Sequence, residues 1–190
     1  IFKRIDNTVV DKWSILFELY TNGNTHIDVV NLENLTIDSN RRGQNIVLTN
    51  PNLYAFEQAA TFKVYCASTS KVNTVSIEKC VFIDPVADDI QVAPSNAVKN
   101  INNLICKDIL FVNRNAMRSS ILFGSAVNNV DVSNIFEIKN GVYSARIESE
   151  FTLMNEFTTY VNAVNINIGR FEMGGDVHDT NTLHCNISNI

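Results

Sequence analysis

The sequence predicts an all-β fold arranged as a solenoid of about five to six coils. Three observations lead to this prediction. One apolar pattern recurs along the chain, short Val- and Ile-rich runs follow several of its copies, and asparagine accounts for 27 of the 190 residues. Asparagine suits tight turns because it tolerates the left-handed backbone and bonds to its own backbone. With 45% hydrophobic and 18% charged residues, the composition is typical of a folded domain with a sizeable core.

The recurring pattern separates four apolar residues by two, three and two positions. In the copy VSIEKCVF, at 75–82, Val75 and Ile77 alternate as in a strand with one buried face. The three-residue step to Cys80 breaks this alternation, so we expect the strand to bend there. The copies begin at Val30, Val75, Leu104, Val130 and Ile166, with a weak sixth at Cys185. The residues expected at or beside the bend are Asn34, Lys79, Asp108, Asn134 and Arg170.

A third strand is expected after the bend in three places, at 45–48, 89–92 and 120–123. Three short strands per copy predict a solenoid, because no copy can bury its inward face alone. The uneven spacing of the copies indicates inserted loops at 49–72 and 148–162. The alternative is a β-sandwich with hairpin turns, for which Asn22-Gly23 and Asn140-Gly141 are candidates.

Two stretches carry a resemblance to a known fold. VSIEKCVFID followed by DDIQV, and LICKDILFVN followed by SSILFGSAVNNVDVSN, resemble coils of the right-handed parallel β-helix proteins of the pectin-lyase-like superfamily. The resemblance covers residues 14–190 and rests on inward-facing positions. It implies a single-stranded right-handed parallel β-helix that binds or cleaves polysaccharides, as phage tailspikes and pectate-lyase-like enzymes do.

The ends of the sequence suggest how the domain is organised. We expect residues 1–190 to form one β-helix domain, with 1–25 as an entry or capping segment. Because the chain starts at Ile1 and the pattern stops midway at Ile190, we expect it to be part of a longer protein.

Charge and cysteine usage narrow the function classes. The net charge of −5 argues against a nucleic-acid partner, which requires a basic surface. No apolar run is long enough to insert into a membrane. The four cysteines lack the spacing of a metal site, and three of them fall at or beside apolar repeat positions, which favours buried free thiols.

One acidic stretch is flanked by arginines in the neighbouring copies. The residues concerned are Asp84, Asp88 and Asp89, with Arg41 and Arg42 on one side and Arg114 and Arg118 on the other. Three carboxylates could hold Ca²⁺, which prefers oxygen ligands, with Asp88 as the metal ligand. The arginines could bind sugar carboxylates. Under the resemblance this implies a lyase, with Asp84, Asp89 and Arg118 catalytic and with Arg118 or Arg114 as the base. The alternative is that acidic and basic turns simply pair across coils.

Further candidates for sugar contact lie beside this stretch. Arg42, Arg114 and Gln91 are candidate substrate-binding residues, as are Glu148 and Glu150. The two glutamates lie on one strand face about 7 Å apart at about 3.3 Å per residue, a separation that fits an inverting glycosidase. Aromatic residues could stack on sugars or could pack internally, and they include Trp13, Tyr20, Tyr54, Tyr65, Tyr143 and Tyr160. The run GGDVHDTN at 174–181 offers a further metal candidate or an exposed turn.

Three functions are consistent with these observations. The first is the body of a homotrimeric phage or prophage tailspike, extracellular or on the virion surface, that either binds or both binds and depolymerises a bacterial capsule or O-antigen. The second is a secreted bacterial polysaccharide lyase or glycoside hydrolase. The third is a structural or adhesin solenoid without catalysis. Ca²⁺ is the one cofactor for which the residues offer ligands.

Overall fold

The chain folds almost entirely into β-strands. The computed structural model describes residues 2–3, 15–41, 60–67, 69–92, 100–112, 114, 118–124, 127–141, 143–150, 158–172 and 182–190. Within these ranges there is no α-helix, and hence no helix that could cross a membrane. The all-β prediction is therefore confirmed for the described residues.

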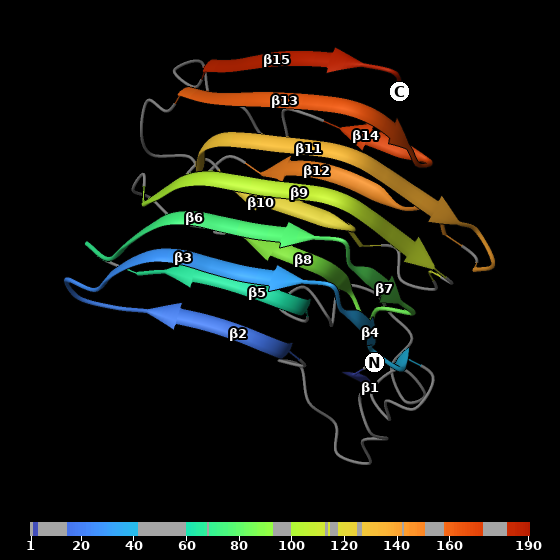
Figure 1. Cartoon of the computed structure of the whole chain (residues 1–190), viewed down its shortest axis with the longest axis horizontal. Coiled ribbons are helices and arrows are strands. Elements are labelled where there is room, and N and C mark those ends of the chain that lie inside the picture. The colour runs from blue at the N-terminus through green and yellow to red at the C-terminus, as the bar shows by residue number, and fades with distance from the viewer. Residues whose placement is uncertain are drawn as a thin grey trace.

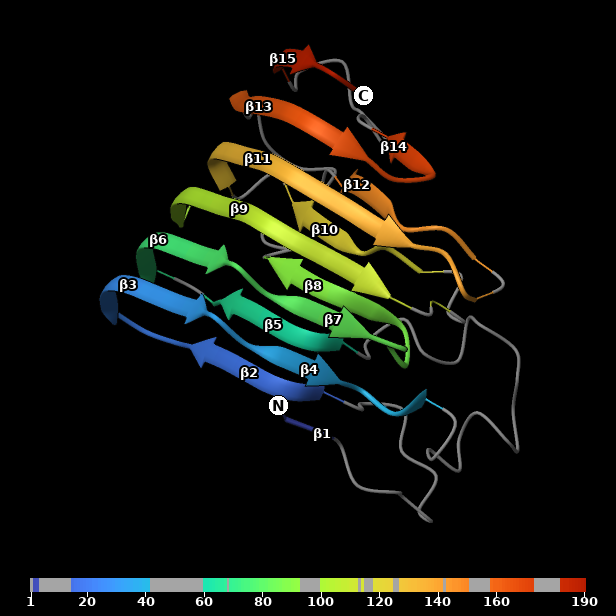
Figure 2. The same ribbon diagram turned by 45° about the vertical axis from the view of Figure 1, so that its right-hand side comes forward.

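The strands form two parallel sheets. The first sheet has nine strands: β1 (Phe2–Lys3), β3 (His26–Glu33), β4 (Thr36–Asp38), β6 (Lys71–Glu78), β7 (Val81–Ile83), β9 (Ile101–Val112), β11 (Val127–Ile138), β13 (Thr158–Asn167) and β15 (Thr182–Ser188). The second has six: β2 (Ile15–Thr21), β5 (Ala60–Cys66), β8 (Asp88–Val92), β10 (Ile121–Gly124), β12 (Arg146–Glu150) and β14 (Arg170–Glu172). Figures 1 and 2 show the two sheets face to face, with their strands running in opposite directions.

The chain passes back and forth between the two sheets. From β2 onward the chain alternates between the two sheets. Each time it returns to a sheet, its new strand or strands pair with those that it last contributed to that sheet. Every pairing between described strands is parallel. A sandwich of antiparallel hairpins, the alternative drawn from Asn22-Gly23 and Asn140-Gly141, is therefore wrong for this part of the chain. We call one passage through the first sheet a rung.

Equivalent apolar residues of successive rungs stack in columns. One column follows the first apolar position of each rung, and its members are Val30, Val75, Leu104, Val130, Val161 and Cys185. The predicted start of the fifth copy at Ile166 is wrong, because Ile166 pairs with Ile135, the third apolar position. The small Ala163 occupies the second position of that rung, so the larger residues further along gave a more convincing apolar pattern.

A left-handed residue marks the bend of each first-sheet rung. The residues with positive φ at this place are Asn34, Lys79, Asp108, Asn134, Asn165 and Asn189, with φ between 53° and 57°. The prediction is confirmed for the first four and wrong for Arg170, which lies in β14 of the second sheet. The bend turns the chain so that apolar residues on both sides of it face the core.

The second sheet contains strands that the sequence predicted and one that it did not. The runs at 89–92 and 120–123 fall in β8 and β10. Strand β5 lies within the predicted loop 49–72, which is a correction, and it pairs between β2 and β8. The predicted loop 148–162 is also too long, because β12 continues to Glu150 and β13 begins at Thr158. The run at 45–48 lies outside the described residues.

The core lies between the two sheets. Its largest fully buried side chains are Phe82, Phe111, Phe123, Ile37, Ile77, Ile90, Ile101, Leu104, Ile109, Ile121 and Ile135. Burial of each such side chain contributes about 1.5–3 kcal/mol. All four cysteines are free thiols. The prediction of burial at the apolar repeat positions is confirmed for Cys80 and Cys106 and wrong for Cys185, which is exposed, whereas Cys66, outside the repeat copies, is also buried in this core.

Candidate functional site

The outer face of the first sheet carries stacked polar side chains. In β11, Val130 and Val132 are buried, so the alternating residues Asn129 and Asp131 point outward. The parallel register places the equivalents of Asn129 and Asp131 directly above them in β13 and β15. The inward apolar pattern therefore also sets the outward polar columns.

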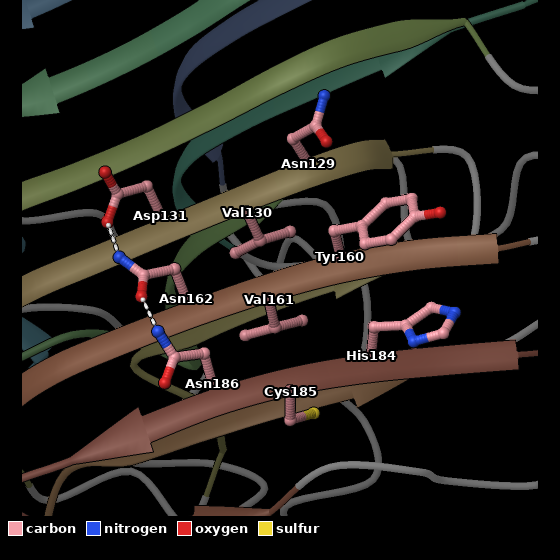
Figure 3. Close-up of a pocket in the computed structure, with 9 residues that line it drawn as sticks. All are labelled: Asn129, Val130, Asp131, Tyr160, Val161, Asn162, His184, Cys185 and Asn186. Carbon is pink, nitrogen blue, oxygen red and sulfur yellow. Dashed lines mark hydrogen bonds between the residues drawn. The ribbon is translucent and has the colours of Figure 1, made fainter.

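Two such columns border a groove that crosses β11, β13 and β15. One column consists of Asn129, Tyr160 and His184, and the other consists of Asp131, Asn162 and Asn186. Val130, Val161 and Cys185 lie between the two columns and complete the lining. The groove is open to solvent and has a volume of about 550 Å³. Figure 3 shows the two columns side by side on the three strands.

The column of Asp131 is a ladder of side-chain hydrogen bonds. The Asn186 amide Nδ2 donates to Asn162 Oδ1 at 3.0 Å, and Asn162 Nδ2 donates to Asp131 Oδ1 at 3.1 Å (Figure 3). Each amide retains a second N–H and a second oxygen lone pair for other partners. The ladder therefore holds three polar groups in fixed positions and still leaves bonding capacity open to a ligand.

The opposite column combines an amide with two rings. The rings of Tyr160 and His184 stack with centroids 4.8 Å apart and planes 10° apart. Tyr160 keeps 54% of its surface exposed. Asn129 Nδ2 donates to Asn103 Oδ1 at 3.2 Å, which continues the polar face toward β9. An exposed aromatic surface opposite an amide ladder can contact the C–H groups of a sugar while the amides bind its hydroxyls.

The predicted acidic cluster forms elsewhere, at the corner where the chain leaves the first sheet for the second. Asp88 and Asp89 begin β8 and have no exposed surface, and Asp84 in the preceding turn is also buried. Arg41 and Arg114, from the corresponding turns of neighbouring rungs, are buried beside them. The sequence thus correctly brought acidic and basic turns together, and the structure places them inside the molecule. We call these five residues the corner cluster.

Asp89 and Arg114 form the most deeply buried ion pair among the described residues. Arg114 Nε lies 3.1 Å from Asp89 Oδ2, and the two side chains are 2% and 0% exposed. Burial, only partly offset by Arg114, raises the pKa of Asp89 to about 7. Arg114 also donates to the carbonyls of Arg118 at 2.8 Å and of Ser144 at 3.2 Å. The guanidinium therefore joins three segments of the corner.

Asp88 is surrounded by donors from the protein itself. Its Oδ1 accepts the Ser119 N–H at 2.6 Å and lies 3.7 Å from Arg118 Nε, while its Oδ2 accepts Gln91 Nε2 at 2.5 Å. Burial raises the pKa of Asp88, against the effect of Arg118. Among the described residues no group of three His, Cys, Asp or Glu side chains could hold a metal ion. Because protein donors occupy the Asp88 carboxylate, the predicted ligands do not fit a Ca²⁺ site.

The other predicted contact residues have varied surroundings. Glu148 accepts the Ser119 hydroxyl at 2.5 Å and pairs with Arg146 at 2.6 Å. Arg42 and the side chain of Glu150 lie outside the described residues, as do Trp13, Tyr54 and the run 174–181. The catalytic roles assigned to Asp84, Asp89 and Arg118 stay predictions, and a polymer would reach the two aspartates only if the corner opened.

Of the residues that line the groove, the sequence analysis identified Tyr160 alone. The column of outward polar residues is present in the sequence, but the fifth copy of the repeat was aligned in the wrong register. When Val161 is aligned with Val130, Asn162 falls beside Asp131. Cys185 aligns with Val161 in the next rung, and Asn186 then falls beside Asn162. The misplaced start at Ile166 hid this polar column.

Comparisons with protein-family models, with curated proteins and with solved structures gave no match for this chain.

Proposed function

We propose that this chain is a right-handed parallel β-helix that binds an extended bacterial polysaccharide, such as a capsule or O-antigen. In this proposal it forms the glycan-recognising body of a homotrimeric tailspike-type protein, extracellular or on the virion surface. The alternation of the chain between two parallel sheets supports the fold. The groove across β11, β13 and β15 is the observation that carries the function.

The chemistry of the groove favours a sugar polymer over other ligands. Its lining combines amides, one carboxylate and an exposed aromatic ring, which together serve hydroxyl groups and C–H faces. Its open shape suits a chain that enters and leaves at both ends. Because parallel strands repeat about every 4.8 Å, three strands present about 10 Å of recurring polar groups, enough for two linked sugar rings.

The test is binding to a panel of purified capsular and O-antigen polysaccharides, measured by calorimetry. We expect at least one polymer to bind and Tyr160→Ala to weaken that binding by about tenfold, since an aromatic contact contributes about 0.5–1.5 kcal/mol. Mass spectrometry of the same mixtures would show whether any polymer is cleaved.

Tyr20 offers a matched control. It is 58% exposed and stacks on Tyr65, with centroids 5.6 Å apart, on the second sheet far from the groove. Tyr20→Ala should leave binding unchanged. If no polymer of the panel binds, the proposal fails and a structural solenoid is favoured; if Tyr20→Ala weakens binding and Tyr160→Ala does not, the binding site is on the other sheet.

A further inference from the structure

Among the described side chains that line the groove, Asp131 carries the one carboxylate, and His184, stacked on Tyr160, is the one basic group. Asp131 lies in the hydrogen-bond ladder and His184 in the opposite column, and no described residue of the lining is a lysine or an arginine. The whole chain carries a net charge of −5. Any anionic ligand in the groove would therefore meet like charge at short range and across the molecule.

The direction of the hydrogen bonds in the ladder also determines which ligand groups Asp131 can bind. The amides of Asn186 and Asn162 each donate toward the preceding rung, so the ladder runs toward Asp131 and ends there. An ionised carboxylate accepts hydrogen bonds and cannot donate them. A ligand group that approaches Asp131 must therefore be a donor, such as a sugar hydroxyl, whereas a sugar carboxylate would bring two further acceptors to the same place.

The arginines that could have bound a sugar carboxylate are engaged elsewhere. Arg114 pairs with Asp89 and donates to backbone carbonyls in the corner cluster, and Arg118 lies beside Asp88. A bidentate arginine is the usual protein partner of a carboxylate. The described residues of the groove offer none.

We infer that the groove selects uncharged, hydroxyl-rich glycans and discriminates against uronate-containing polymers, with Asp131 as the specificity-determining residue. This inference rests on the proposed function, because it concerns the same groove. The inference also defines how the polymer lies in the groove. The sugar chain crosses the strands, with its hydroxyl groups along Asp131, Asn162 and Asn186 and its C–H face toward Tyr160.

The experiment compares two forms of the same acidic polysaccharides. Each uronate-containing polymer of the panel is tested as the native polymer and after chemical reduction of its carboxyl groups to primary alcohols, which removes charge and keeps linkage. We expect the reduced form to bind about fivefold tighter at low salt, with the difference shrinking in high salt as charges are screened. Asp131→Asn should reduce the ratio of the affinity for the reduced form to the affinity for the acidic form by about threefold.

Asp108 supplies the control for the loss of one negative charge. It accepts an amide hydrogen bond from Asn134 at 2.7 Å, as Asp131 does from Asn162, but it lies at the bend of β9, outside the groove. Asp108→Asn should leave the difference between the two polymer forms unchanged.

The outcomes separate this inference from the proposed function. Equal or tighter binding of the acidic form overturns the inference while glycan binding itself stands. A preference for the reduced form that Asp131→Asn does not narrow overturns the assignment to Asp131. Absence of binding by every polymer, neutral, acidic or reduced, overturns the proposed function and the inference with it.

Discussion

The groove and the corner cluster are both polar, yet they differ in almost every physical respect. The groove residues are largely exposed, mostly uncharged and bonded to one another through amides. The corner cluster is buried and built of charges, and the oxygens of Asp89 accept no hydrogen bond of good geometry among the described residues. A polar group exposed to water loses little hydration free energy when the protein folds. A buried charged group loses much more, and it remains ionised only if a partner compensates for the lost hydration.

This difference separates groups available to a ligand from groups committed to the fold. The amides of the groove retain bonding capacity and face solvent. The arginines of the corner cluster are directed at carboxylates and carbonyls of successive rungs and hold the turns between the two sheets. Gly141 fits this role, because a side chain there would collide with the backbone of Arg114. The following predictions test this separation.

The largest effect is expected from Arg114→Met. Removing the guanidinium leaves the Asp89 carboxylate buried without Arg114 and removes the hydrogen bonds that Arg114 donates to three backbone carbonyls. Breaking one side of a buried pair destabilises a protein by about 3–5 kcal/mol. Urea unfolding at pH 8, above the pKa of about 7 that Asp89 has in the wild type, should show a loss of this size.

The double variant Arg114→Met with Asp89→Asn is the matched control. It removes the uncompensated charge, so it should regain part of the lost stability. A loss below about 1 kcal/mol in the single variant would mean that the corner cluster is no more structural than an exposed surface pair.

The next effect is a pH dependence that resides in the corner cluster. The folded pKa of Asp89 is raised to about 7, above the unfolded value of about 3.9, so the folded protein holds this proton more tightly. The stabilisation is therefore complete below about pH 4 and is lost as the pH rises through about 7, by an amount on the order of a few kcal/mol. Burial of Asp88 acts in the same direction.

Thermal unfolding of the wild type and of Asp89→Asn between pH 5 and pH 8 measures this dependence. The wild type should lose stability over that interval, and the variant should lose distinctly less because an amide does not ionise. Equal slopes for the two proteins would contradict the assignment to Asp89.

The sequence predicted the apolar columns better than the polar ones, and the reason is physical. Val30, Val75, Leu104 and Val130 face a shared core, so each rung must supply an apolar residue there. The outward positions carry no such constraint, and Asn162 is visible as part of a ladder only once the register of Val161 is known. Burial of Asp88 and Asp89 also depends on which segments cover β8, which no local pattern encodes.

A smaller effect is expected at the bend of β13. Asn165 has φ of 57° and donates its Nδ2 to Asn134 Oδ1 at 2.8 Å. Asn165→Ala removes this bond and places alanine in a left-handed conformation, so we expect a loss of about 1–2 kcal/mol in urea unfolding. Asn165→Gly should lose less, because glycine accepts the conformation. A greater loss with glycine than with alanine would show that backbone conformation is not what selects asparagine here.

The smallest effect on stability is expected at Asn162, three residues earlier in the same strand. Asn162 lies in the groove ladder, in ordinary strand conformation and partly exposed, so Asn162→Ala should change unfolding stability by no more than about 0.5 kcal/mol. Binding of a glycan that the wild type recognises should nevertheless fall by about tenfold, because the central group of the ladder is removed. Stability and binding would then respond oppositely at two asparagines of one strand. If Asn162→Ala instead lost as much stability as Asn165→Ala and kept its binding, the groove ladder would serve to stabilise the fold, as the corner cluster does.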